Sequence, residues 1–319
     1  MFVTRKDSEQ GHSLSSPSVH EKSGKPLRVG GQAVIEGVMM RSPHSMAIAV
    51  RRPDGEIVVK RKGLSFFSEQ SPFFKLPLVR GVLALISALV LGIEALNFSA
   101  NQAFSEEEKA PSPWAMGLTF ALALCFGILL FFMVPLFMTK GLKVILPVLS
   151  ESGFLFNLVD GILRLLIFLA YLWAISLIGE IQRVFQYHGA EHKSIFAFES
   201  GEELKVERVK GFGYLHPRCG TNFLLMVMVV SIFIFSLLPH HLPFGYKVAS
   251  RVVFIPLIAG LAYEMIRFAD KKRENWGIRT VIQPGLWLQR LTAREPSEDQ
   301  IEVAIRALQE VLELERRHC

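Results

Sequence analysis

The stretch WAMGLTFALALCFGILLFFMVPLFMT, residues 114–139, contains no charged side chain and is long enough to cross a bilayer as a helix. Residues 221–239 also lack charge, and residues 154–179 are interrupted only by Asp160 and Arg164. Hydrophobic residues make up 50% of the 319 positions, and charged residues make up 20%. This composition is typical of a multi-pass membrane protein. The sequence therefore predicts an α-helical membrane protein.

Two weaker apolar runs, 81–93 and 252–263, are assigned by the distribution of Lys and Arg, which favour the cytoplasmic side. If only the second run crosses, residues 1–113, 180–220 and 270–319 carry 14, 6 and 9 Lys or Arg on one side. Only Lys140, Lys143 and Lys247 then face the other side. We therefore expect about four transmembrane helices, with both termini cytoplasmic.

This topology divides the chain into eight segments. They are a disordered leader (1–27), a small cytoplasmic β-rich unit (28–75), an interfacial or re-entrant helix (76–100), a linker (101–113), a first transmembrane pair (114–179), a cytoplasmic connection (180–220), a second transmembrane pair (221–269) and a cytoplasmic amphipathic tail (270–319). In the β-rich unit, the turn sequence Pro53-Asp54-Gly55 predicts a hairpin. In the tail, Ser297 and Gln300 form a capping box that starts a helix. Its apolar stripe is expected to bury against the β-rich unit or the connection: Ile301, Ile305, Leu308 and Leu312.

The net charge of +6 is explained by the cytoplasmic Lys and Arg together with anionic lipid headgroups, which are the expected partners. Nucleic-acid binding is not needed to explain it, and the oligomeric state stays open. The three cysteines are scattered and do not form a disulfide framework. On the cytoplasmic side, Cys219 is expected to be a reduced thiol that is free to bind metal.

The segment YHGAEH, residues 187–192, lies between two apolar runs and carries the main chemical signal. If it is helical, His188 and His192 project from one face, at the spacing with which two imidazoles hold one metal ion. Glu191, next to the second histidine, is placed to act as a base for metal-bound water. The spacing predicts a site for a divalent metal, with zinc as the best match to histidine ligands.

Two ligand sets are open. The first is a closed, structural tetrahedron made by His188, His192, His216 and Cys219. In the second, the two helical histidines bind with Glu264 or Cys219, water fills the fourth position, and Glu191 takes its proton. His-x-x-Glu-His is the order of ligands and base in the inverted zinc proteases. The plain alternative is that the histidines only form hydrogen bonds with carboxylates at the membrane interface.

Asp160 and Arg164 lie one helical turn apart within an apolar run. Charges at this depth are costly, so they are expected to pair. They indicate either a polar transport pathway or a buried pair that fixes helix packing, and we favour packing.

Several long segments resemble the YqhQ-like proteins, a bacterial membrane family of unknown function whose members are generally labelled predicted metal-dependent enzymes. The resemblance covers about residues 28 to 315. The segments that carry it are GGQAVIEGVM (30–39), FQYHGAEHK (185–193), Cys219-Gly220, PGLWLQ (284–289) and Glu295-Pro296. It implies a metal-dependent enzyme in the bacterial inner membrane and brings no established reaction with it.

The sequence thus favours a zinc-type hydrolase at the cytoplasmic face of the membrane, with Glu191 as general base. A peptide or a lipid headgroup is the expected substrate. The alternative is a non-enzymatic membrane scaffold or assembly factor whose cytoplasmic part is held by a closed metal site.

Overall fold

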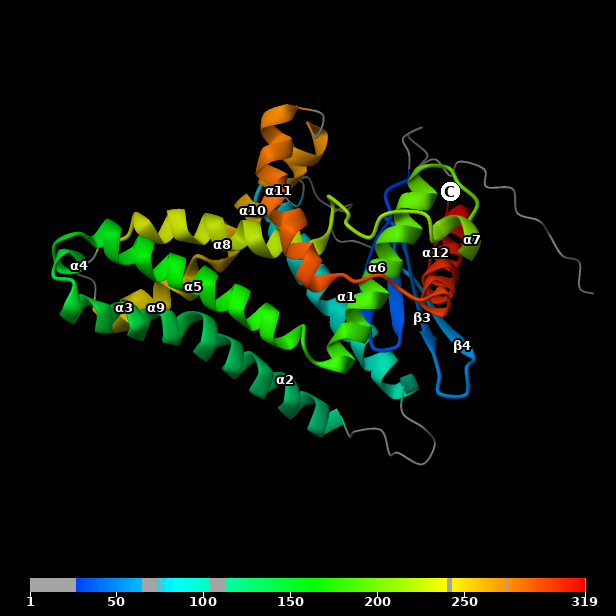
Figure 1. Ribbon diagram of the computed structural model, residues 1–319, viewed down its shortest axis with the longest axis horizontal. Coiled ribbons are helices and arrows are strands. Elements are labelled where there is room, and N and C mark those ends of the chain that lie inside the picture. Colours follow the sequence, from blue (N-terminus) through cyan, green and yellow to red (C-terminus); the bar gives the residue numbers. More distant parts are fainter. Residues whose placement is uncertain are drawn as a thin grey trace, which may run out of the picture.

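The computed structural model describes residues 27–64, 74, 76–103, 113–239, 243–272 and 275–318. Figure 1 shows an elongated bundle of helices that meets, at one end, a lobe containing a sheet and further helices. Apart from Leu27, the expected disordered leader lies outside the described residues, and so does most of the expected linker.

The sheet has four antiparallel strands in the order of the chain. They are β1 (Gly30–Val34), β2 (Gly37–Arg41), β3 (Ser45–Arg51) and β4 (Ile57–Gly63). The predicted hairpin at residues 53–55 is confirmed: it joins β3 to β4, and Gly55 has a φ of 90°, a backbone conformation that favours glycine. Gly37 is needed for packing, because a Cβ there would lie 2.2 Å from the Ala49 carbonyl oxygen.

Both faces of the sheet are covered by helices. On one face, Met40, Ala47 and Ala49 pack against α6 (Gly179–Glu199) and α12 (Glu298–His318). The alternate residues of the same strands, such as Met39 and Ile48, pack against α1 (Val79–Ala103) on the other face. This alternation follows from the two-residue period of a strand.

The helix α12 forms as its sequence predicts. Gln300 Oε1 accepts the Ser297 backbone N–H at 3.0 Å, which is one half of the capping box. The four residues of its apolar stripe are all buried against the sheet and α6, which confirms where the stripe was expected to pack.

The bundle is made of apolar helices that run back and forth along its length. They are α2 (Pro113–Ile128), the π-helix η3 (Leu129–Met133), α3 (Val134–Ile145), α4 (Val148–Glu151), α5 (Gly153–Ile175), α8 (Gly220–Ser236), α9 (Phe244–Val253) and α10 (Ile255–Lys271). Two further helices, α7 (Val206–Val209) and α11 (Trp276–Thr292), lie outside this set. In Figure 1, α11 runs crosswise to α5 and α8.

Three helices of the described residues are long and apolar enough to cross a membrane: Val79–Ala103, Gly117–Ile145 and Gly153–Ile175; α8 is apolar but shorter. This set differs from the expected one at three places, the first being α8, which was expected to cross and is shorter than a span. The helix expected at the interface, α1, has the length of a span. The run 252–263, which was also expected to cross, is instead divided at Phe254 between α9 and α10, because Pro256 in the first turn of α10 lacks the N–H that would continue α9.

The two halves of α1 have different surroundings. Near its start, α1 packs closely on α10, since a Cβ on Gly81 would lie 2.9 Å from Gly260 Cα. Farther along, Leu91 and Ala95 join the core beneath the sheet. Glu94 is paired with Lys60 and Lys62 of β4, so this half of the helix belongs to the sheet lobe.

The helix α11 was not predicted, because Pro284 and Gly285 lie within it and both residues usually weaken helices. Its formation matters for the candidate site, since its last turn contacts the histidine helix α6.

Candidate metal centre

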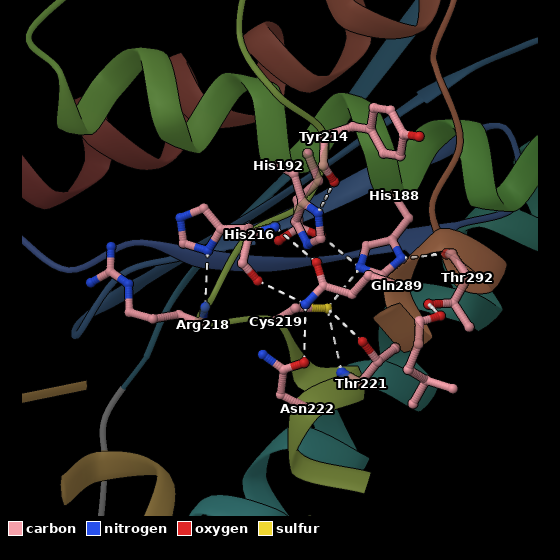
Figure 2. A network of polar contacts seen from close by, with 12 residues as sticks. His188, His192, Tyr214, His216, Arg218, Cys219, Thr221, Asn222, Gln289 and Thr292 are labelled. Atoms are coloured by element: carbon pink, nitrogen blue, oxygen red, sulfur yellow. Dashed lines mark hydrogen bonds and ion pairs between the residues drawn. The ribbon is translucent and has the colours of Figure 1, made fainter. Parts of the chain in front are cut away.

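The helix α6 carries both histidines of the motif on one face, as their spacing requires. The ring centroids of His188 and His192 are 4.4 Å apart. His192 is 1% exposed, and Glu191 between them is 5% exposed. Figure 2 shows the two imidazoles directed toward Cys219, which comes from the start of α8. The predicted helical pair is therefore confirmed.

Backbone carbonyls hold both imidazoles in one orientation. His188 Nδ1 lies 2.7 Å from the Thr292 carbonyl oxygen at the end of α11, and His192 Nδ1 lies 2.6 Å from the Tyr214 carbonyl oxygen. A carbonyl oxygen only accepts, so each Nδ1 is the donor, and each Nε2 of the neutral ring carries a lone pair. This is how metal-binding histidines are usually held.

Cys219 Sγ lies opposite these lone pairs. It is 3.1 Å from His188 Nε2 and 3.1 Å from the Thr221 hydroxyl, and it accepts the Thr221 backbone N–H at 3.4 Å. Cys219 is the N-cap residue of α8, where backbone N–H groups and the positive end of the helix dipole favour negative charge. A sulfur at this place suits a cation bound next to it.

The three ligand atoms of His188, His192 and Cys219 lie within 4.8 Å of one another, close enough to bind one metal ion. Among the described residues, His192 Nε2 is buried and makes no hydrogen bond of normal geometry, and Cys219 lies close enough to interact with it. Buried polar atoms that make no such bond are rare in folded proteins, and a metal bound to this lone pair would account for it. Burial lowers the pKa of His192 and so favours the neutral, metal-binding ring. The residues thus fit a zinc-type ion with three protein ligands.

Glu191 lies beside this group. Its carboxylate is 4.0 Å from His188 Nε2 and accepts a hydrogen bond from the Gly31 backbone N–H of β1. Burial raises the pKa of Glu191, and nearby His188, His216 and the Gly31 amide counteract part of that rise. A buried carboxyl next to a metal position is chemically suited to accept a proton from water.

The other two predicted ligands are directed elsewhere. His216 Nδ1 accepts the Arg218 backbone N–H, and His216 Nε2 lies 3.7 Å from Glu199, which also pairs with the Arg218 guanidinium. The His216 ring remains next to the group, 5.6 Å from His192. Glu264 forms a two-pronged ion pair with Arg80 of α1. The structure therefore brings three of the five predicted ligands together.

Gln289 is a structural residue of the site that the sequence reasoning missed. It is fully buried on α11, accepts the His216 backbone N–H at 2.8 Å and donates to the His216 carbonyl at 2.8 Å. It also donates to Asn222 Oδ1 at 3.1 Å. Gly285, one turn earlier, leaves room for Asn222, since a Cβ there would lie 2.3 Å from its Oδ1. The sequence signal for these Gln289 contacts was the PGLWLQ segment, which entered the sequence analysis only through its resemblance to the YqhQ-like proteins.

Within the bundle, Asp160 accepts from two buried arginines rather than one. Arg164 and Arg251 each approach Asp160 Oδ2, at 2.9 and 2.8 Å. The Phe235 ring lies between both guanidinium groups, at 5.4 and 5.2 Å. This arrangement connects α5, α8 and α9, which agrees with a packing role for Asp160 and Arg164.

Comparisons with known proteins identify the family of the chain. Residues 76–314 match a family described as "Protein of unknown function (DUF1385)". The chain is also 35% identical over 303 residues to "Uncharacterized protein YqhQ" of Bacillus subtilis (strain 168), which covers 91% of this chain and 94% of that protein. No solved structure matches the chain. With this extent of similarity, the chain belongs to the DUF1385 family, and it is similar to YqhQ across nearly its whole length.

Proposed function

We propose that this protein is a metal-dependent hydrolase that works at the cytoplasmic face of the bacterial inner membrane. The observation that carries the proposal is the grouping of the buried His192 Nε2 with His188 Nε2 and Cys219 Sγ, beside the buried carboxyl of Glu191. Zinc bound there would supply Lewis acidity and lower the pKa of water.

The number of ligands favours catalysis over a structural role. Structural zinc sites have four protein ligands, whereas catalytic sites have three and leave one position open. His216 is the residue that would close the tetrahedron, and it is held by backbone contacts and faces Glu199. In the proposed reaction, Glu191 takes a proton from the attacking water, and the carbonyls of Thr292 and Tyr214 keep both imidazoles in place.

The location follows from the elements that hold the ligands. Cys219 caps the apolar helix α8, and α6 begins four residues after the span Gly153–Ile175 ends. The centre therefore belongs where the helices leave the bilayer. In this proposal, the basic segments lie on the cytoplasmic side with both termini. The first half of α1 contacts lipid, and its second half covers the sheet.

The test uses purified protein loaded with zinc in detergent. We expect about one zinc per chain, as metal sites of this kind bind a single ion. His192→Ala and Cys219→Ser should lose the zinc. Glu191→Gln should keep the zinc and lose hydrolysis of a panel of peptide and lipid-ester probes.

Glu180→Gln is the matched control, because Glu180 is an exposed carboxylate in the first turn of the same helix. If wild-type protein binds no zinc, or if Glu191→Gln hydrolyses the probes as fast as wild type, the proposal is wrong. Zinc that is bound without hydrolysis, and whose removal unfolds the sheet lobe, would instead support the scaffold alternative.

A further inference from the structure

The strand β1 is one edge of the described sheet, and its free backbone groups can be identified. Val34 and Gly37 are opposite each other across the β1–β2 turn. Arg51 N–H of β3 donates to the Glu36 carbonyl oxygen at 2.8 Å, so Glu36 is the residue that bonds toward β3. The backbone groups of the next residue, Gly37, therefore point toward β1. Hydrogen-bonded pairs alternate along an antiparallel ladder. The N–H and C=O groups of Gly31 and Ala33 therefore point away from β2, toward the free edge.

The two edges of the sheet differ in their protection. The edge strand β4 carries Lys60, Arg61 and Lys62, and charged residues of this kind prevent another strand from pairing. The edge strand β1 has the sequence GGQAV, with no charge and no proline. A Cβ on Gly30 would meet nothing within 4 Å, so the sheet face at the start of β1 is open. Only one edge is thus blocked by charge.

The unprotected edge adjoins the candidate metal centre. Gly31 N–H, one of the outward-pointing groups, donates to the Glu191 carboxylate. At the other end of β1, Glu36 in the turn is paired with Arg183 and lies 3.3 Å from the Tyr187 hydroxyl. The helix α6 therefore follows β1 along its length, from the turn to the proton acceptor of the site.

We propose that the substrate is an extended peptide that binds as an additional strand along β1. The Ala33 N–H and C=O and the Gly31 C=O would bond to the peptide backbone, and Gly31 N–H would keep Glu191 at the end of this ladder. A strand edge offers donors and acceptors at the spacing of a peptide backbone, and a lipid headgroup has no such repeat. This inference rests on the proposed hydrolase function and names its substrate class.

The chemical step is the hydrolysis of one peptide bond. The water oxygen bonds to the carbonyl carbon, and the bond between this carbon and the nitrogen breaks. One water proton passes through Glu191 to the leaving nitrogen, so the products are a carboxylic acid and an amine. A peptide that is paired with β1 brings its carbonyl beside Glu191 without any additional element.

The test measures binding of a fluorescent pool of unstructured 12-residue peptides to the zinc-loaded Glu191→Gln protein. Ala33→Pro removes one outward N–H and no ladder bond, and proline is tolerated on edge strands. We expect it to weaken binding about tenfold, as the loss of one backbone hydrogen bond predicts. Ala33→Val is the matched control, since it adds similar bulk, keeps the N–H and should bind within about twofold of the parent.

A second measurement leaves the protein unchanged. Peptides methylated on alternate backbone nitrogens should still bind, because only every second N–H faces β1, whereas peptides methylated on every backbone nitrogen should lose binding. Equal binding of the alternately and the fully methylated peptides, or equal binding by Ala33→Pro and Ala33→Val, would overturn the proposal. So would wild-type protein that hydrolyses lipid esters but no peptide, and in that case the hydrolase function would stand. If neither probe is hydrolysed while methylation-sensitive peptide binding persists, the hydrolase function fails and the peptide site remains.

Discussion

Gly189 lies between His188 and the proposed proton acceptor Glu191, and replacing it with alanine tests how tightly the site is packed. A Cβ at this position would be 2.0 Å from the Arg294 carbonyl oxygen and 3.3 Å from Pro296 Cδ. Real Cβ contacts of this kind are well over 3 Å, so the segment between α11 and α12 must move by more than about 1 Å. The same segment is held by the hydrogen bond from Arg294 N–H to the Phe185 carbonyl, at 2.9 Å.

The expected magnitude is the sum of three effects. Overpacking costs about 1–3 kcal/mol, and the loss of the Arg294 hydrogen bond costs about 0.5–1.5 kcal/mol. Alanine is a better helix former than glycine by about 1 kcal/mol, which opposes these losses. We expect Gly189→Ala to destabilise the sheet lobe by about 0.5–3.5 kcal/mol and to weaken zinc binding, because the Thr292 carbonyl that orients His188 lies just before the displaced segment.

The assay is thermal unfolding of the detergent-solubilised protein together with a zinc titration. Gly179→Ala is the matched control, since Gly179 begins the same helix and a Cβ there meets nothing within 4 Å. It should be neutral or slightly stabilising. A Gly189→Ala protein that is as stable as Gly179→Ala and binds zinc equally well would refute the packing argument.

Two further predictions concern buried carboxylates away from the centre. Burial alone would raise the pKa of Glu315, but hydrogen bonds from Ser42 and His44 outweigh this effect and hold its pKa below the usual value. The ionised Glu315 therefore stabilises the protein at neutral pH, and this stabilisation is lost as the pH falls through the depressed pKa. Glu315→Gln should destabilise the sheet lobe by about 1–3 kcal/mol at pH 7. In thermal melts at several pH values, the variant should also lose less stability on acidification than the wild type. In the bundle, Asp160→Asn removes the carboxylate that pairs with the buried Arg164 and Arg251. The variant should be about 3–5 kcal/mol less stable in thermal unfolding of the detergent-solubilised protein. An unchanged melting temperature would show that this ion cluster does not hold α5 to α9.

The elements with local signals were predicted well. The hairpin at residues 53–55, the helical spacing of His188 and His192, and the apolar stripe of α12 all depend on periods of two or about four residues, which the sequence displays directly. The helix α11 was missed because Pro284 within it argues against a helix, and burial against α8 overrides that preference.

The choice among ligands depended on contacts between distant segments. Cys219 reaches the histidines because α8 starts there, whereas Glu264 is taken by Arg80, a partner 184 positions away in the chain. No local pattern distinguishes these two outcomes, since both residues lie near the end of an apolar run. The same holds for Arg251, which joins Asp160 from a helix that the sequence placed in a continuous span.

The sequence by itself determined the membrane character, the β-rich unit and the pair of histidines on one helical face, because hydropathy and periodicity are local properties. Only the tertiary structure decided that Cys219 lies beside the two histidines, that His216 turns toward Glu199, and that the edge of β1 lies against Glu191. Those outcomes depend on which elements pack together, and packing is settled by the shapes and charges of segments that are far apart in the chain.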